Sequence, residues 1–493
     1  MMSVPKNPIN LTPFVGRSSE LEKLLSLTKK KVASLVVVHG RRRVGKSRLI
    51  EEFGKKLGKN ARFYAFSGLP PRPTITTQDQ LDEFARQLSY QTGLPEIKAD
   101  DWSKLFILLA EKCQKGRVTI LLDEITWMGS KDPDFLGKIK NAWDMYFKKN
   151  PTLILILCGS VSSWIEENIL QSTGFVGRVS LTLTLQEFSL RECNNFFEEI
   201  DFHSSAYDKF KILSVTGGIP KYLEEIRPDI SADENIKLLC FEKSGILFKE
   251  FDHLFSDLFS KKYDFYKKIV KFLVSQNAEF NDISHEMNIS KGGYLSESLD
   301  VLIKSGFIKR DYTWNLRTKK EARLSHYRLS DNYLRFYLKY IDKNKWKIEN
   351  DQFNDRSIVG LPGWESIIGL QFENLVLNNR KLIWEKLHIY AEDIVADNPF
   401  FQRKTVRTPG CQIDYLIQTS ANALYVCEIK FSKNALSGTV IEQMKEKLSR
   451  LSVPKGLSHV PILIHVNGVQ DIVEESEYFK NIVDFSEFFD AGS

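Results

Sequence analysis

The sequence predicts a multidomain α/β protein. Its 493 residues exceed what one hydrophobic core organises, since cores stop growing at roughly 250–300 residues. The composition is globular, with 42% hydrophobic and 27% charged residues, which excludes a disordered chain. Buried-strand patterns followed by helical patterns fill the first third, and alternating strand patterns occupy the last third. These observations predict two α/β regions joined by a helical one.

The first motif is Gly-x-x-x-x-Gly-Lys-Ser at residues 40–47, directly after an apolar run at residues 36–38. It has the strand-before, helix-after context of a phosphate-binding loop. Glycines let the backbone curl around a phosphate, Lys46 reaches the β- and γ-phosphates, and the Ser47 hydroxyl ligates Mg²⁺. The alternative is an ordinary strand-to-helix turn. The predicted nucleotide-binding residues are Gly40, Arg43, Val44, Gly45, Lys46, Ser47 and Arg48.

The second motif is an apolar run at residues 118–122 that ends in Asp123 and Glu124. A strand with this ending places both carboxylates at the carboxyl edge of the sheet, where ligands bind in open α/β folds. We expect Asp123 to hold Mg²⁺ and Glu124 to polarise the attacking water. The alternative is a pair of solvated acids at a strand end.

Three further features extend this region. Residues 152–158 predict a buried strand, and Ser160 follows it, either contacting the γ-phosphate and the attacking water or capping the next turn. Residues 61–66 predict another strand. Arg178 lies between turn residues and a strand, where an arginine can complete neutralisation of the γ-phosphate. A surface arginine is the alternative.

Helix signals flank these strands. Ser18 or Ser19 is expected to cap a helix that includes residues 21–27. Ser189 is expected to cap a helix that opens a small helical region. Further on, two glycines at residues 217–218 end one helix, and Pro220 occupies the first turn of the next.

Together, these motifs resemble the archaeal-type ATPases of the AAA+/STAND group, which also occur in bacteria. The resemblance spans about residues 12–240 and rests on five ordered motifs: Phe14-Val15-Gly16-Arg17, Leu121-Leu122-Asp123-Glu124, Gly159-Ser160, Gly177-Arg178-Val179 and Gly217-Gly218-Ile219-Pro220-Lys221-Tyr222-Leu223. It implies ATP rather than GTP. It also implies that Arg17 lies near the adenine, that Ser160 is a sensor, and that Lys221 is a second sensor near a lid.

The middle of the chain predicts three helices, at residues 265–274, 280–287 and 294–304, the last capped by Ser290. A strand at residues 307–310 and a hairpin follow, which is the winged-helix order. Members of the resembled family carry such a domain here, followed by a helix that matches residues 327–336. The hairpin is either a phosphate-binding wing or a solvated basic face of a protein-docking domain. Its basic residues are Lys309, Arg310, Arg317, Lys319, Lys320 and Arg323.

The last third predicts a hairpin, with strands at residues 411–418 and 424–430 and a turn at residues 420–422. Asn422 suits the left-handed position of a three-residue loop, and this loop would set Asp414 opposite Glu428. Lys430 lies on the same face as Glu428 because side chains alternate along a strand. Two carboxylates can hold a divalent cation, and an adjacent lysine can stabilise charge developing on a phosphate.

This hairpin and its flanks, at about residues 362–485, resemble the PD-(D/E)XK restriction-endonuclease-like fold, which also ends members of the resembled ATPase group. The resemblance implies a nuclease-like domain that uses Mg²⁺ or Mn²⁺, with Lys430 as a catalytic residue and Gln443 as an accessory. Four residues after Gln443, where some such nucleases have an aromatic residue, stands Lys447. The implied metal ligands are Glu373, Asp414 and Glu428.

These predictions divide the chain into four parts. They are a P-loop ATPase core at residues 1–183, a helical lid at 184–258, a winged-helix-like domain at 259–345 and a nuclease-like domain at 346–493. The predicted function is an ATP-binding and ATP-hydrolysing switch coupled to a metal-dependent nuclease that acts on nucleic acid. The alternative is an ATP-regulated switch that binds proteins or DNA and carries an inactive nuclease-like domain.

Charge and cysteine content set the expected surroundings. The net charge of +6 is compatible with a nucleic-acid partner, and Arg178 would act in its own chain or on a neighbour in an oligomer. Six scattered cysteines without a C-x-x-C pair predict buried free thiols in a reducing compartment. Residues 1–11 lack an apolar signal segment, and no stretch reaches membrane-spanning length. The sequence therefore predicts a soluble, cytoplasmic protein with no membrane partner.

Overall fold

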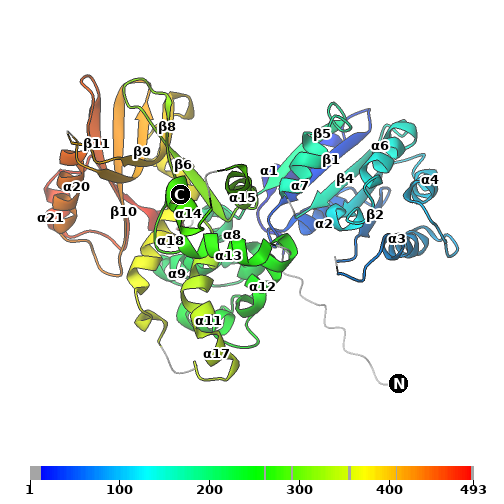
Figure 1. Cartoon of the computed structure of the whole chain (residues 1–493), viewed down its shortest axis with the longest axis horizontal. Helices are drawn as coiled ribbons and strands as arrows, with labels where there is room; N and C mark the ends of the chain where they lie inside the picture. The colour runs from blue at the N-terminus through cyan, green and yellow to red at the C-terminus, as the bar shows by residue number, and fades with distance from the viewer. Residues whose placement is uncertain are drawn as a thin grey trace. The chain divides into compact units, whose positions relative to one another are not determined.

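The structure is a computed structural model in which the described residues form two compact units (Figure 1). The first unit ends at Glu187 and the second begins at Phe188. The described residues are 13–70, 72–160, 162–259, 262–289, 292–353, 357–406 and 408–489, without the side chains of residues 162 and 257.

The first unit is built on a five-stranded parallel sheet with the order β2-β3-β4-β1-β5. The central strand β4 and its neighbour β1 are buried along their whole length, as expected for strands covered on both faces. The strands are β1 (Ser34–Gly40), β2 (Arg62–Ser67), β3 (Val118–Asp123), β4 (Leu153–Gly159) and β5 (Val179–Leu185). The strands predicted at residues 61–66, 118–122 and 152–158 are thereby confirmed.

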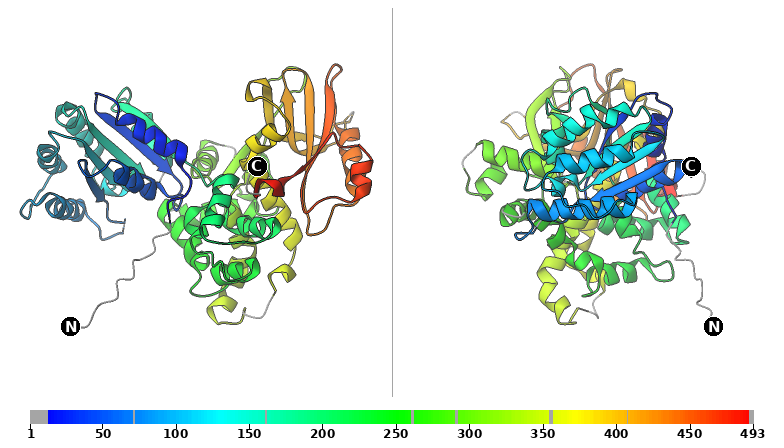
Figure 2. Two further views of the ribbon diagram at one scale, coloured as in Figure 1. Left: turned by 180° about the vertical axis from the view of Figure 1, so that it is seen from behind. Right: turned by 90° about the vertical axis from the view of Figure 1, so that its right-hand side faces the viewer.

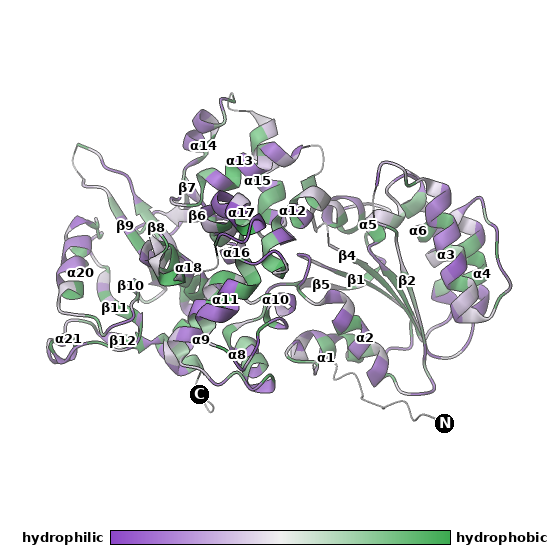
Figure 3. Ribbon diagram, turned by 90° about the horizontal axis from the view of Figure 1, so that it is seen from below, coloured by the Kyte–Doolittle hydropathy of each residue, from purple (hydrophilic) through white to green (hydrophobic). Residues whose placement is uncertain are grey.

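Helices cover both faces of this sheet, with α1 and α2 on one side and α3, α4 and α6 on the other (Figure 3). The helices are α1 (Ser18–Leu27), α2 (Lys46–Lys56), α3 (Thr77–Thr92), α4 (Trp102–Lys112), α5 (Ile125–Met128), α6 (Phe135–Met145) and α7 (Ser162–Ile165). The expected serine cap of α1 is wrong. Arg17 precedes the helix in a left-handed conformation, with φ 58°, and no side chain caps its first turn.

The second unit opens with α-helices: α8 (Leu190–Glu199), α9 (Ala206–Thr216), α10 (Pro220–Leu223), α11 (Ala232–Cys240) and α12 (Ile246–Phe259). Two local predictions are confirmed. Ser189 caps α8 in a reciprocal capping box with Glu192. Pro220 occupies the first turn of α10, where the missing N–H costs no hydrogen bond.

Three helices and an antiparallel hairpin follow in the predicted order: α13 (Tyr263–Phe272), α14 (Phe280–Glu286), α15 (Gly293–Lys304), β6 (Ile308–Trp314) and β7 (Glu321–Leu329). The proposed cap Ser290 lies outside the described residues. The helix expected at residues 327–336 does not begin at residue 327. Residues 327–329 instead form the end of β7 and pair with β6. Helix α16 covers only Asn332–Phe336, where the Asp331 carboxylate accepts the Leu334 N–H.

The chain then forms a π-helical turn at Tyr337–Ile341, helix α17 (Asp342–Glu349) and a mixed sheet with the order β12-β11-β10-β9-β8. Figure 2 shows this sheet as orange to red strands with helices beside it. Its strands are β8 (Ile394–Gln402), β9 (Cys411–Thr419), β10 (Ala423–Phe431), β11 (Ser458–Val466) and β12 (Asn481–Asp484). The accompanying helices are α18 (Trp364–Asn378), α19 (Arg380–Lys386), α20 (Thr439–Arg450) and α21 (Asp471–Glu475). Helix α18 packs on β10 and α20 packs on β9.

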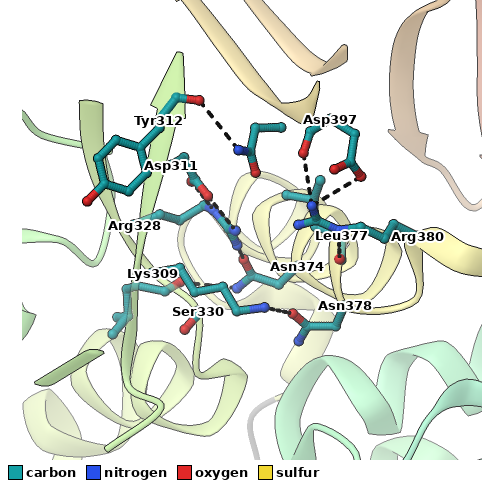
Figure 4. Close-up of polar contacts among 12 residues, drawn as sticks. Lys309, Asp311, Tyr312, Arg328, Ser330, Asn374, Leu377, Asn378, Arg380 and Asp397 are labelled. Atoms are coloured by element: carbon teal, nitrogen blue, oxygen red, sulfur yellow. Dashed lines mark hydrogen bonds and ion pairs between the residues drawn. The ribbon is translucent and has the colours of Figure 1, made fainter. Parts of the chain in front are cut away.

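A buried polar network joins the hairpin to α18 (Figure 4). Arg328 of β7 donates to the Asp311 carboxylate of β6 at 2.8 Å, and both side chains are only 3% exposed. Arg328 also donates to the Asn374 side chain, and Asn374 donates to the Leu329 carbonyl at 3.1 Å. Because Asn374 is adjacent to Glu373 on α18, these bonds help to position the helix that carries this carboxyl group.

All six cysteines are free and buried, as predicted. Burial raises the pKa of the Cys158 and Cys240 thiols well above the ordinary value, so these thiols stay protonated. Within the described residues, no helix combines the length and apolar character needed to cross a bilayer.

Candidate functional site

The phosphate-binding loop connects β1 to α2, and its glycines are required by its shape. Gly40 has φ 151° and Gly45 has φ 86°, both in the region that favours glycine. A Cβ atom on Gly40 would lie 2.3 Å from the Leu185 carbonyl oxygen of β5. The glycine thus allows the loop to begin where β1 meets β5.

Lys46 lies inside the curl of this loop. Its side chain is buried, and Nζ donates to the Gly40 carbonyl at 2.9 Å and to the Arg41 carbonyl at 3.0 Å. Burial lowers the pKa of Lys46, while the charges of Glu124 and Asp123 oppose this shift. The ammonium group is therefore held at the loop by carbonyl groups that a phosphate could replace as its partners.

Ser47 and Asp123 come together as predicted from their separate motifs. The Ser47 Oγ atom donates to Asp123 Oδ2 at 2.7 Å, and the Glu124 N–H donates to Asp123 Oδ1 at 3.0 Å. The second of these bonds orients the carboxylate toward the loop. A hydroxyl and a carboxylate oxygen at this spacing are hard ligands of the kind that Mg²⁺ prefers, so the residues fit the predicted ion.

Glu124 and Ser160 form the other pair at this edge. The Ser160 Oγ atom donates to Glu124 Oε2 at 2.9 Å, which brings the tips of β3 and β4 together. Glu124 has φ 48°, a strained conformation for a non-glycine residue. Burial raises its pKa, and the Lys46 charge opposes this effect. A raised pKa makes the half-buried Glu124 carboxylate a stronger base, which favours a general-base role beside the phosphate loop.

Arg17 contacts the backbone of the loop through its guanidinium side chain. Its buried guanidinium donates from Nη2 to the Val44 carbonyl at 3.1 Å and to the Gln186 carbonyl at 2.5 Å. It thus ties the phosphate loop to the end of the first unit. Arg43 has φ 72° in the loop and Arg48 lies in the first turn of α2.

Arg178, predicted to neutralise the γ-phosphate, and Lys221, predicted as a second sensor near a lid, have other partners in the structure. Arg178 binds the Asp144 carboxylate, with its Nη2 atom 2.8 Å from Oδ2, and the guanidinium holds the pKa of that carboxyl well below its usual range. Lys221 belongs to the second unit and pairs with Glu225 at 2.7 Å and with Glu224 at 3.3 Å. Their roles at the γ-phosphate stay predictions.

The second group of candidate residues, Asp414, Glu428 and Lys430, lies on the β9–β10 hairpin. The pairing register of this hairpin agrees with the prediction that Asp414 lies opposite Glu428. Cys427 pairs with Tyr415, so one further step sets Glu428 opposite Asp414. Asn422 ends the turn with φ 62°, as its residue type predicts. The Ile429 N–H donates to Asp414 Oδ2 at 3.1 Å and orients this carboxylate.

Two lysines surround the Glu428 carboxylate, which is 1% exposed. Lys430 Nζ lies 2.7 Å from Oε1. Lys447 of α20 contacts both acids, with its Nζ atom 2.5 Å from Glu428 Oε2 and 3.0 Å from Asp414 Oδ1. Lys447 was not among the predicted site residues. The available signal was its spacing, since a residue four positions after Gln443 lies on the same face of a helix.

Glu373 belongs to the same electrostatic neighbourhood. Burial, followed by the charge of Asp414, raises the pKa of Glu373 to about 7. Glu428, Lys430, Gln443 and Lys447 line a cavity of about 360 Å³. Over the described part of the chain, no three His, Cys, Asp or Glu side chains converge as a ready metal site. The Lys447 ammonium stands between two of the predicted ligands, Asp414 and Glu428.

A family model matches the part of the chain that carries the first site. Residues 14–226 match a family described as an ATPase domain predominantly from Archaea. An uncharacterised protein of Methanocaldococcus jannaschii is 25% identical over 371 residues, which cover 73% of this chain and 76% of that protein.

Two solved structures align with this chain, and the first of them shares its fold. The Walker-type ATPase paby2304 of Pyrococcus abyssi aligns with TM-score 0.50 and 17% identity, over 66% of this chain and 96% of its own. The ORC2 protein of Aeropyrum pernix, in its ADPNP–ADP complexes, aligns with TM-score 0.41 and 14% identity, over 69% of this chain and 97% of its own. Residues 14–226 are therefore similar to an ATPase domain of the type found predominantly in Archaea.

Proposed function

We propose that this protein is an ATP-binding and ATP-hydrolysing switch. The observation that carries the proposal is the convergence of Lys46, the Ser47–Asp123 pair and the Glu124–Ser160 pair at one edge of the parallel sheet. These groups supply what phosphoryl transfer needs, namely a cation at the β- and γ-phosphates, ligands for Mg²⁺ and a base near the attacking water. The match of residues 14–226 to an ATPase family supports ATP as the nucleotide.

In this proposal Glu124 accepts the proton of the attacking water and Ser160 orients its carboxylate. Ser47 and Asp123 hold Mg²⁺, whose role is to neutralise phosphate charge. Arg178 completes the neutralisation after it exchanges Asp144 for the γ-phosphate, within its own chain or toward a neighbouring one. Arg17 connects nucleotide binding at the loop to the end of the first unit.

The test compares phosphate release and ATP binding. Glu124→Gln should lower the rate of phosphate release at least about 100-fold while ATP still binds, because it removes the base but keeps the shape. Lys46→Ala should abolish ATP binding in calorimetry. Glu22→Gln, an exposed change on α1, is the control and should behave as the unaltered protein. Equal hydrolysis rates for Glu124→Gln and Glu22→Gln would remove Glu124 from its role.

We propose further that the ATPase unit controls a nuclease-like domain at the C-terminus. The arrangement of Asp414, Glu428 and Lys430 supports this extension, since two carboxylates and a lysine can hold a divalent cation and contact a scissile phosphate. The three-helix and hairpin region, interpreted as a winged helix, would bind the phosphates of the nucleic acid. This binding should weaken steeply with salt.

One observation favours a second candidate, an ATP-regulated binding switch with an inactive nuclease-like domain. Lys447 pairs with both Asp414 and Glu428 and so satisfies the acids without a metal. Cleavage of plasmid and single-stranded DNA or RNA with Mg²⁺ or Mn²⁺ separates the candidates. Cleavage by the unaltered protein supports the nuclease if it is lost in Glu428→Ala and in Lys430→Ala but kept in the exposed control Glu442→Ala. ATP-dependent nucleic-acid binding without any cleavage supports the second candidate.

A further inference from the structure

We propose that Lys447 and a divalent cation exclude one another between Asp414 and Glu428, so that metal enters only when the Lys447 side chain swings out. This inference rests on the proposed nuclease-like site and names the residue that controls its loading. Lys447 would then be a built-in counter-ion that keeps the site closed to metal when no substrate is present.

The geometry places one ammonium group on two oxygens from different strands. Lys447 Nζ lies 3.0 Å from Asp414 Oδ1 and 2.5 Å from Glu428 Oε2. The remaining oxygens have other contacts, because Asp414 Oδ2 accepts the Ile429 N–H and Glu428 Oε1 faces Lys430 at 2.7 Å. Lys447 contacts both carboxylates, so a cation placed between Asp414 Oδ1 and Glu428 Oε2 would take the position that this ammonium group now holds.

Charge leads to the same conclusion. With both carboxylates ionised and both lysines protonated, the charges of Asp414, Glu428, Lys430 and Lys447 balance. A divalent cation added without any rearrangement would leave two excess positive charges in a largely buried place, which is unfavourable at low dielectric. Moving the Lys447 ammonium outward relieves the closest of these repulsions.

The structure also offers Lys447 an alternative position. Its side chain is 27% exposed and lines the cavity of about 360 Å³ together with Gln443 and Arg450 of the same helix. An ammonium group released into this cavity needs a new anion, and a phosphate of the nucleic-acid backbone is the anion that the proposed reaction brings. Metal binding and phosphate binding should then strengthen each other, because linkage between two ligands is reciprocal.

The first experiment measures Mn²⁺ affinity by calorimetry in the full chain without nucleotide. All variants carry Asp123→Asn so that the first unit does not contribute a metal site. Lys447→Met, which keeps most of the side chain but removes the ammonium group, should bind Mn²⁺ at least about tenfold more tightly than the parent. Lys445→Met removes an exposed lysine from the same helix and should change the affinity little. Asp414→Asn should abolish binding at this site.

The second experiment uses the protein with Lys447 in place. Its result therefore does not depend on whether the Lys447→Met variant folds correctly. Amine acetylation followed by mass spectrometry should show that saturating Mn²⁺ increases labelling of Lys447 several-fold, with labelling of Lys445 unchanged. Labelling of Lys447 that Mn²⁺ leaves unchanged, or equal Mn²⁺ affinities for the parent and Lys447→Met, would overturn the exclusion while leaving the metal site itself intact. Absence of Mn²⁺ binding in every variant, Lys447→Met included, would overturn both the exclusion and the proposed nuclease.

Discussion

Removal of the Arg328 charge tests whether the buried network holds the second unit together. In Arg328→Met the aliphatic stem is kept, but the Asp311 carboxylate, 3% exposed, loses its partner. Breaking a buried pair by removing one partner costs about 3–5 kcal/mol. The Asn374 oxygen loses its donor as well, so the upper half of this range is expected. For a unit of about 300 residues, with an unfolding entropy of about 2.1 cal/mol/K per residue, a loss of about 4 kcal/mol lowers the melting temperature by roughly 6 °C.

Scanning calorimetry measures the change, and hydrogen exchange of the β6 and β7 amides localises it. The control is Arg227→Met, which breaks an ion pair with Asp229 whose side chains are 57% and 61% exposed and should leave melting unchanged. The double variant Arg328→Met/Asp311→Leu should recover much of the loss, since it leaves no unpaired charge. The reasoning is refuted if Arg328→Met melts like the Arg227→Met control.

Three further predictions concern the loop, the carboxyl group on α18 and the thiols. Gly40→Ala should abolish ATP binding in calorimetry, because its Cβ would meet the Leu185 carbonyl; Gly137→Ala on α6, with open space around its Cβ, should bind normally. The pKa of Glu373 is raised from 4.5 to about 7, so its contribution to stability is complete below pH 4.5 and is lost as pH rises through 7. Between pH 5 and 7.5, the free energy of unfolding measured with urea should therefore fall less in Glu373→Gln than in the unaltered protein, by about 3 kcal/mol at most. An equal fall in the two proteins would contradict this. Cys158 and Cys240 should not react with a disulfide reagent at pH 8 until urea unfolds the chain; prompt native reaction would count against their burial.

Several features of the fold followed from local patterns. The glycines at 40 and 45 predicted a loop that only positive φ angles permit, and both angles are positive. In the C-terminal hairpin, Asn422 and the three-residue turn set the register, and strand alternation then set Glu428 across from Asp414. Both predictions succeeded because steric rules act over a few neighbouring residues.

Other features could not be deduced this way. The Ser18 or Ser19 cap failed because Arg17 adopts the left-handed conformation, from which its guanidinium reaches two distant carbonyl groups. Residues 327–329 read as the start of a helix, but pairing with β6 extends β7 through them. In both places a long-range partner competed with the local preference and prevailed.

The sequence by itself determined which chemical groups this protein brings to phosphate chemistry: the phosphate loop, the acids after β3, and the acids and Lys430 of the hairpin. Only the tertiary structure decided their partners. Lys447 meets Asp414 and Glu428 because α20 packs on β9, and Arg328 meets Asn374 because α18 packs beside the β6–β7 hairpin. Long charged side chains take their partners from the packing of whole elements, and no pattern of neighbouring residues encodes the angle at which two elements pack.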